Sequence, residues 1–331
     1  MKILLIGAQG RLGKELLRSL APHGPLVACV RPGSSQPRDD ESGRRESAWA
    51  DVSCPDQLRD LVARMRPNLI VNAAAYTAVE AAEGDPLAAM AVNETAPGVL
   101  AEAASKIGAA LVHYSTDYVF GGHGDRAWRE TDAPDPQNVY GRTKLAGEEA
   151  IRSVGADHLI VRTSWLYAIH AQSFAKKMLD LASRQSEIAM VTDQIGAPTS
   201  ARFVADVTGS IIAAAAGDPA TFFRTRGGTL HVACAGETSW YAFAKAIFDQ
   251  ARELRLPVSI PTIHPILSAS RPAALARPLN SRLDTTRLRE RFSLVPPPWD
   301  TEFRAQFPSL FAQYLLETGG TPKPNKASPP E

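Results

Sequence analysis

The strongest constraint on the fold lies at the N-terminus, where a short apolar run leads directly into a glycine-rich turn. The run spans residues 3–6, and the glycines that follow it are Gly7, Gly10 and Gly13. Gly7 permits a tight turn, Gly10 lets the backbone approach a pyrophosphate, and Gly13 allows close packing of the helix expected over residues 14–20. The first amides of that helix would hold phosphate groups. The pattern predicts a dinucleotide-binding βαβ unit.

The first half of the chain repeats this alternation of apolar runs and helical stretches. Further strands are expected at residues 26–30, 69–72, 111–114 and 159–161, and helices at residues 55–65, 86–107 and 140–153. Continuous apolar strands between helices indicate a parallel sheet that is covered on both faces. Because crossovers between parallel strands are right-handed, we expect an α/β fold with a doubly wound, Rossmann-type sheet.

The alternation fades after about residue 165, where proline and arginine become more frequent. We expect an NAD(P)-binding domain over residues 1–165 and a smaller, mixed α/β substrate-binding region over residues 166–318. Parts of residues 200–236 are expected to return to the first domain. The elements expected beyond residue 165 are helices at residues 203–216 and 239–254 and a strand at residues 229–233. Residues 319–331 are rich in glycine and proline, and this composition predicts a disordered tail.

Composition excludes several classes of function. The 36 lysines and arginines balance 35 aspartates and glutamates, so no excess of positive charge is available for a nucleic acid or an anionic membrane. No apolar stretch approaches the roughly 20 residues of a membrane span. The three cysteines, Cys29, Cys54 and Cys234, form no CxxC pair. Their spacing argues against a zinc site or a disulfide framework and indicates a cytoplasmic protein.

The residue that ends the second expected strand bears on the choice of dinucleotide. An acidic residue about 20 positions after the glycines would hold a ribose 2′-hydroxyl. The sequence has Arg31 there, which could bind the 2′-phosphate of NADPH. A solvated arginine at the start of the polar loop expected over residues 31–49 is the alternative. We therefore favour NADPH and leave NADH open.

Three residues have the pattern of a carbonyl-reducing site. Tyr140 and Lys144 are four residues apart, which places them on one face of a helix, and Thr116 ends the strand that starts near residue 111. A free phenol has a pKa of about 10, and we expect the ammonium of Lys144 to lower the pKa of Tyr140. Tyr140 would protonate a carbonyl oxygen as a hydride reaches its carbon, and Thr116 would donate a second hydrogen bond. A surface helix bearing an aromatic and a charged residue is the alternative.

These motifs and their surroundings resemble the dTDP-4-dehydrorhamnose reductases of the extended short-chain dehydrogenase/reductase superfamily. The resemblance covers nearly the whole chain and lies in residues 7–13, 71–80, 92–93, 113–120, 138–144, 162–167, 193–199 and 277–283. The segments most particular to the family are Asn72-Ala73-Ala74-Ala75-Tyr76-Thr77, Asp193-Gln194-Ile195-Gly196-Ala197-Pro198-Thr199 and Arg277-Pro278-Leu279-Asn280-Ser281. The resemblance implies NADPH-dependent reduction of the C4 ketone of dTDP-4-dehydro-β-L-rhamnose.

The resemblance also implies roles for individual residues. The dinucleotide would be lined by Gly10, Arg11, Leu12, Asp51, Val52, Ala75, Tyr76 and Thr77. The deoxysugar would contact Thr116, Asp117 and Trp165. From the residues alone, Asp51 and Val52 could instead precede a helix as an ordinary cap, and Trp165 could be a core aromatic. Arg277 and Arg282 could be surface charges or could bind a nucleotide diphosphate.

The sequence departs from the family at two places. Arg11 stands where the family commonly has glutamine. Of the positions that build a magnesium site between subunits in some members, Glu15 and Asp300 are acidic but Arg202 is not, which argues against bound Mg²⁺ and leaves Glu15 as the candidate ligand. A monomer and a homodimer both remain open. The rival functions are a reductase or epimerase of another nucleotide sugar and a non-catalytic, dinucleotide-binding regulatory subunit.

Overall fold

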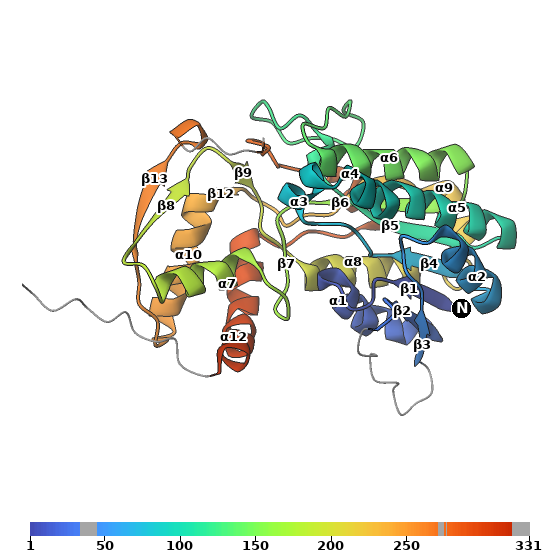
Figure 1. Ribbon diagram of the computed structural model, residues 1–331, viewed down its shortest axis with the longest axis horizontal. Helices are drawn as coiled ribbons and strands as arrows, with labels where there is room; N and C mark the ends of the chain where they lie inside the picture. The colour runs from blue at the N-terminus through green and yellow to red at the C-terminus, as the bar shows by residue number, and fades with distance from the viewer. Residues whose placement is uncertain (34–44, 271–274, 276, 320–331) are drawn as a thin grey trace, which may run out of the picture.

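A seven-stranded parallel sheet forms the centre of the structure, a computed structural model that describes residues 1–33, 45–270, 275 and 277–319 (Figure 1). Every neighbouring pair of strands is parallel, in the order β11-β6-β5-β4-β1-β2-β3. The strands are β1 (Ile3–Ile6), β2 (Leu26–Val30), β3 (Arg45–Trp49), β4 (Leu69–Asn72), β5 (Ala110–Thr116), β6 (His158–Thr163) and β11 (Gly228–His231). The order reverses between β1 and β4, which confirms the doubly wound α/β fold.

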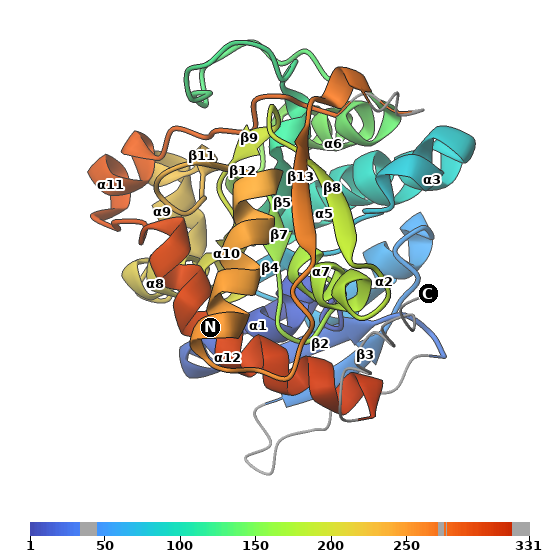
Figure 2. The ribbon, with the colours of Figure 1, turned by 90° about the vertical axis from the view of Figure 1, so that its left-hand side faces the viewer.

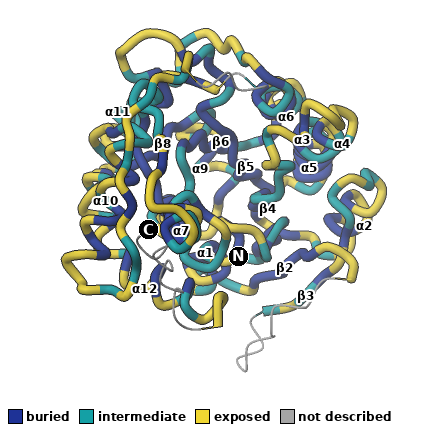
Figure 3. The backbone as a smooth tube through the Cα atoms, turned by 60° about the vertical axis from the view of Figure 1, so that its left-hand side comes forward, coloured by how far each residue is buried: buried dark blue, intermediate teal, exposed yellow. Residues whose placement is uncertain are grey.

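Two layers of helices cover this sheet because alternate side chains of each strand point to opposite faces. Ile3 and Leu5 pack in one buried cluster, whereas Leu4 and Ile6 pack in the other. The helices of the first cluster are α1 (Arg11–Leu20), α8 (Ala201–Ala214), α9 (Pro219–Arg226) and α11 (Thr286–Phe292). The helices of the second are α2 (Pro55–Met65), α5 (Ala96–Ile107) and α6 (Val139–Val154). Figure 3 shows the inner strands of the sheet in the dark blue of buried residues.

Two segments differ from the sequence-based expectation. The loop expected over residues 31–49 ends in β3, which pairs with β2 from Leu26 to Val30; residues 34–44 lie outside the described residues. The helix expected over residues 86–107 consists of α4 (Pro86–Met90), a π-helical turn (Ala91–Thr95) and α5. In that turn the amide of Ala96 donates to the carbonyl of Ala91, five residues earlier, and such π turns are frequent at functional sites.

A second group of elements lies beside the sheet (Figure 1) and has its own buried cluster. Figure 2 views the molecule from the side of this group. Its helices are α7 (Phe174–Ala182), α10 (Trp240–Glu253) and α12 (Trp299–Thr318). Its strands form two-stranded sheets: β8 (Glu187–Val191) with β13 (Thr262–Ile266), β7 (Leu166–Tyr167) with β10 (Thr199–Ser200), and β9 (Ile195–Gly196) with β12 (Thr238–Ser239). Phe243, Phe303 and Phe307 are at its centre.

The remaining elements connect these two bodies or flank the sheet. They are α3 (Val79–Gly84) and the 3₁₀ turns Ala21–His23, Asp117–Val119 and Ser268–Ser270. The division at residue 165 stays a proposal, with α8, α9, β11 and α11 packing in the first body. Of the expected tail, only Gly319 lies within the described residues. Across the described part of the chain, none of the helices combines the length and hydropathy needed to traverse a bilayer.

Candidate functional site

A cavity of about 880 Å³ opens where the carboxyl ends of the sheet strands face the second body. Its wall includes residues from α1, β2, β5 and α6 and from α7 and α10, so both bodies contribute to it. The residues expected from the sequence that line it are Gly7, Gly10, Arg11, Leu12, Arg31, Asp51, Val52, Ala75, Tyr76, Thr77, Thr116, Asp117, Tyr140, Lys144 and Trp165. The cavity therefore brings together the segments that sequence reasoning assigned separately to the dinucleotide and to the sugar.

The glycine turn forms one end of this cavity. Gly7 has a positive φ of 78°, and a Cβ placed there would lie 2.7 Å from the amide nitrogen of Ala74. Gly13 does not line the cavity, but a Cβ there would lie 2.1 Å from the carbonyl oxygen of Gly7. Gly10 is the N-cap of α1, and no side chain caps that helix. The turn therefore leaves the first amides of α1, at Arg11 and Leu12, beside the cavity, where an anion would be stabilised.

Asp51 and Arg31 lie at the same end. The carboxylate of Asp51 accepts hydrogen bonds from the backbone amide and the hydroxyl of Ser53, at 2.9 and 2.7 Å. These bonds, with a smaller contribution from the charge of Arg31, lower the pKa of Asp51. The N-cap of α2 is Cys54 rather than Asp51, so Asp51 shapes the turn before the helix. Arg31 is exposed on the cavity wall.

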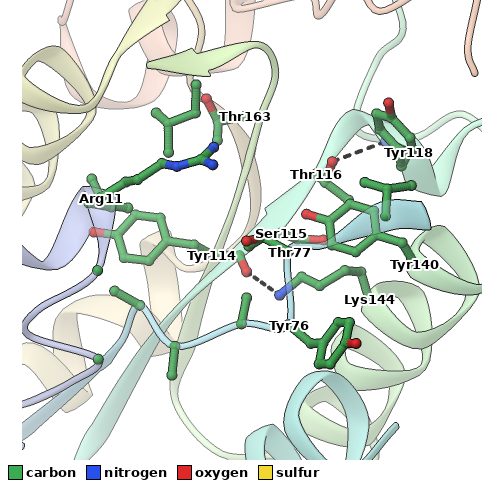
Figure 4. A pocket seen from close by; sticks show the side chains of 18 of the residues that line it. Arg11, Tyr76, Thr77, Tyr114, Ser115, Thr116, Tyr118, Tyr140, Lys144 and Thr163 are labelled. Carbon is green, nitrogen blue, oxygen red and sulfur yellow. Dashed lines mark hydrogen bonds between the residues drawn. The ribbon is translucent and has the colours of Figure 1, made fainter. Parts of the chain in front are cut away.

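Thr116 and Tyr140 meet in the middle of the cavity (Figure 4). Thr116 accepts a hydrogen bond from the amide of Tyr118 at 3.2 Å and donates one to Asp117 at 3.1 Å. Burial raises the pKa of Tyr140 to about 12, although a hydrogen bond with Thr116 partly offsets this effect. The phenol therefore carries its proton at neutral pH, as an acid catalyst must.

Lys144 is buried beneath Tyr140, and its ammonium is not the dominant influence on that phenol. Its Nζ donates to the carbonyl oxygen of Tyr114 at 2.6 Å (Figure 4). The same Nζ lies 3.2 Å from Nε2 of His113. Burial lowers the pKa of Lys144 to about 8, partly offset by Glu148. The expectation that Lys144 lowers the pKa of Tyr140 is wrong for this structure, because desolvation disfavours both charged forms.

Asp117 and Trp165 form the end of the cavity that faces the second body. Asp117 is buried, which raises its pKa to about 6, and a hydrogen bond with Ser281 opposes that shift. Trp165 has a positive φ of 47° and stacks on Trp240, with 3.7 Å between the ring centroids and 10° between the planes. Trp165 is therefore a wall residue of the cavity rather than an aromatic of the second body's buried cluster.

Sequence reasoning missed three further residues that line the cavity, Ser281, Trp240 and Lys177. Ser281 belongs to the Arg-Pro-x-x-Ser segment, which could have identified it. Trp240 and Lys177, from α10 and α7, belong to no motif and reach the cavity only through the packing of the second body. Of the two arginines left open, Arg277 lines the cavity and donates to Glu80. Arg282 instead pairs with Glu237 at 2.5 Å, so the two arginines do not act together.

Glu15, the candidate metal ligand, does not line the cavity. Its carboxylate lies 3.4 Å from Nε of Arg18 and 3.5 Å from Nδ1 of His170. Among the described residues, no three histidine, cysteine or acidic side chains are grouped as metal ligands. Glu15 thus takes part in a polar network on α1.

Comparisons with known proteins agree on one family. Residues 1–310 match the family described as the RmlD substrate binding domain. The dTDP-4-dehydrorhamnose reductase of Escherichia coli K12 is 42% identical over 311 residues, which cover 94% of this chain and 98% of that protein. The reductase of the same name from Burkholderia thailandensis is 42% identical over 301 residues, covering 90% and 95%.

Solved structures of the same name share the fold. The dTDP-4-dehydrorhamnose reductase of Clostridium acetobutylicum is 30% identical with a TM-score of 0.78, and the match covers 94% of this chain and all of that one. The Bacillus anthracis reductase, solved in complex with NADP, is 30% identical with a TM-score of 0.75 and coverages of 92% and 97%.

Proposed function

The chain belongs to the dTDP-4-dehydrorhamnose reductase family, and we propose that it reduces the C4 ketone of dTDP-4-dehydro-β-L-rhamnose with NADPH to form dTDP-β-L-rhamnose. It is an NADP-linked oxidoreductase of that family. The observation that carries the proposal is the single cavity into which the glycine turn, Thr116, Tyr140 and Lys144 all open. The cavity thus combines a place for a dinucleotide with a proton donor for a carbonyl.

The residues present fit a dinucleotide. The uncapped start of α1, with Arg11 and Leu12 on the cavity wall, suits a pyrophosphate. The exposed guanidinium of Arg31 suits a 2′-phosphate, because arginine binds phosphate through two parallel hydrogen bonds. Ala75 is small enough for close approach of a flat ring, and Lys144 would bind the nicotinamide ribose. NADPH, when bound, supplies the hydride that reaches C4 of the sugar.

Side chains of the protein supply the proton that the carbonyl oxygen takes up. Tyr140 donates its phenolic proton to the carbonyl oxygen at C4, and Thr116 donates a hydrogen bond to the same oxygen as negative charge develops there. Asp117 and Trp165 hold the deoxysugar, with the face of the tryptophan against its apolar side. Burial favours the protonated form of Tyr140 before the reaction, which suits carbonyl reduction.

Purified protein should consume NADPH only when the keto-sugar nucleotide is present. Replacing Tyr140 by phenylalanine should lower kcat by at least about 10²-fold, since it removes the general acid, while NADPH affinity changes little. Tyr118→Phe is a matched control, because this tyrosine lies 5.4 Å from Tyr140, centroid to centroid, in the same cavity. A Tyr140→Phe enzyme with the turnover of the Tyr118→Phe enzyme would refute the assigned proton donor.

The rival functions predict other results. Faster turnover of a UDP-linked keto-sugar than of the dTDP-linked one would favour a different nucleotide sugar. No NADPH consumption with either, together with a stable partner on co-purification, would favour a regulatory subunit. We also propose a cytoplasmic location, supported by the free thiols of Cys29, Cys54 and Cys234. We further propose a monomer or homodimer without a magnesium bridge, supported by the contacts of Glu15 with Arg18 and His170.

A further inference from the structure

Two cationic side chains line the cavity but have no role in the proposed chemistry. They are Lys177 on α7 and Arg277, which lies in the segment between the last 3₁₀ turn and α11. Among the described residues, the other charged side chains of the wall are Arg11, Arg31, Asp51, Asp117 and Lys144. Each of these belongs to the dinucleotide site or to the sugar site, so Lys177 and Arg277 are left for a different anion.

Backbone hydrogen bonds fix the segment that carries Arg277. The amide of Asn280 donates to the carbonyl oxygen of Gly122, in the loop between β5 and α6, at 2.8 Å. The carbonyl oxygen of Leu279 accepts from the amide of Ile195 on β9, also at 2.8 Å. The segment therefore bridges the first and second bodies, and Arg277 reaches the cavity from their boundary.

The carboxylate of Glu80 on α3 is near both cations. Nη2 of Arg277 donates to its Oε1. The pKa of Glu80 is lowered by a hydrogen bond with its own backbone amide and, against partial desolvation, by the charges of Arg277 and Lys177. Lys177 and Arg277 are thus within electrostatic reach of one carboxylate, at one end of the cavity.

This end of the cavity adjoins the proton donor. Burial raises the pKa of Tyr118, and the charge of Arg277 opposes that rise. The ring of Tyr118 packs edge-on against the ring of Tyr140, with 5.4 Å between the centroids. In a hexose, C1 lies across the ring from C4. A sugar that places C4 at Tyr140, with the dinucleotide at the opposite end, would direct its anomeric phosphate toward Arg277 and Lys177.

Both cations are available to such a phosphate group. Arg277 and Glu80 keep 45% and 64% of their side-chain surface exposed, and exposed ion pairs contribute little to stability. Lys176 pairs with Glu317 at 2.7 Å, whereas no carboxylate in the described part of the chain pairs with Lys177. A guanidinium binds phosphate through two parallel hydrogen bonds, and an ammonium acts as a point charge. Together they suit two neighbouring phosphates that each carry a negative charge.

We propose that Lys177 and Arg277 bind the diphosphate of the sugar nucleotide, and that Glu80 holds Arg277 until the diphosphate replaces it. The identity of the sugar rests on the proposed function, whereas recognition of the diphosphate does not. A keto-sugar without a diphosphate gains neither cation and leaves the ion pair of Arg277 intact. The exchange therefore selects a nucleotide-linked substrate over the free sugar.

Calorimetric titration with dTDP tests this site without turnover. NADP⁺ is kept at saturation, so that dTDP cannot occupy the pyrophosphate site at the start of α1. Lys177→Gln and Arg277→Gln should each raise Kd for dTDP about tenfold or more, since each removes a charged hydrogen bond. Lys245→Gln and Arg282→Gln are the matched controls, because neither side chain lines the cavity, and they should leave Kd unchanged. No measurable binding of dTDP to the wild-type protein, or the wild-type Kd in both cavity variants, would overturn the proposal.

The direction of the effect at Glu80 separates exchange from a merely structural role. Glu80→Gln removes the competing charge and should lower Kd for dTDP about threefold or more. A carboxylate that only kept Arg277 in place would raise Kd when lost, so an unchanged or higher Kd would overturn the exchange. A protein that shows these affinities but does not reduce the keto-sugar nucleotide would refute the proposed function alone. Reduction of the keto-sugar nucleotide by variants with the wild-type Kd for dTDP would refute the diphosphate site alone.

Discussion

The buried ion pair behind the catalytic helix gives the sharpest stability prediction. Glu148 on α6 is 0% exposed and Arg162 on β6 is 2% exposed. The guanidinium donates from Nε to Oε1 at 2.8 Å and from Nη2 to Oε2 at 2.6 Å. The pair joins the strand to the helix that carries Tyr140 and Lys144. We take Glu148→Gln as the perturbation, since it removes one charge with little change in volume.

The expected loss of stability in Glu148→Gln follows from the charge that remains buried on Arg162. Arginine stays protonated in proteins, so the charge of Arg162 has no counter-charge once Glu148 is neutral. Removing one partner of a buried ion pair costs about 3–5 kcal/mol of stability. The whole free energy of unfolding of a typical protein is about 5–15 kcal/mol. Glu149→Gln makes the same change at the next residue, which is exposed, and should cost less than about 0.5 kcal/mol.

Chemical denaturation at pH 7 measures the difference. The free energy of unfolding of Glu148→Gln should lie about 3 kcal/mol or more below that of Glu149→Gln, with the denaturant dependence unchanged. Free energies of unfolding within about 1 kcal/mol of each other in the two variants would refute the reasoning. The buried charge of Arg162 would then be stabilised by a group other than Glu148.

Three further outcomes are expected. The ion pair and hydrogen bonds of Glu148 hold its pKa below the usual value. Its contribution to stability is therefore complete above about pH 4.3, the ordinary pKa of a glutamate, and is lost as pH falls through the lowered pKa. The difference in unfolding free energy between wild type and Glu148→Gln should shrink in acid, and a constant difference would contradict this. Arg31→Ala should raise KM for NADPH about tenfold or more but leave KM for NADH unchanged. An equal rise in KM for both coenzymes in steady-state kinetics would show that Arg31 does not bind the 2′-phosphate. Trp240→Ala removes the ring stacked on Trp165 and should raise KM for the keto-sugar nucleotide while KM for NADPH stays the same; the opposite pattern would place the stack at the nucleotide.

Local patterns in the sequence predicted the central sheet well. The runs at residues 3–6 and 26–30 are continuously apolar and the run at 69–72 is apolar up to Asn72, and each is a strand with those bounds. β3 was missed because its residues, Arg45–Trp49, are mainly polar: it is an edge strand with Trp49 exposed. Its pairing with β2 comes from the tertiary fold and leaves no hydrophobic periodicity to detect.

The site could be predicted where its residues lie in continuous motifs. The positions of Thr116, Tyr140 and Lys144 in one cavity follow from the carboxyl edge of a parallel sheet. Trp240 could not be found in this way, since it approaches Trp165 only when α10 packs within the second body. The lowered pKa of Lys144 was also beyond the sequence, because it results from the burial of that side chain in the folded protein.

The central claim is that a hydride reaches C4 of the keto-sugar as Tyr140 protonates its oxygen. The most direct measurement uses NADPH that carries deuterium at C4 of the nicotinamide, on the transferred face, and the product is examined by NMR. The account predicts one deuterium at C4 of the deoxyhexose and none elsewhere. Deuterium at another carbon, or a product sugar without deuterium, would contradict it.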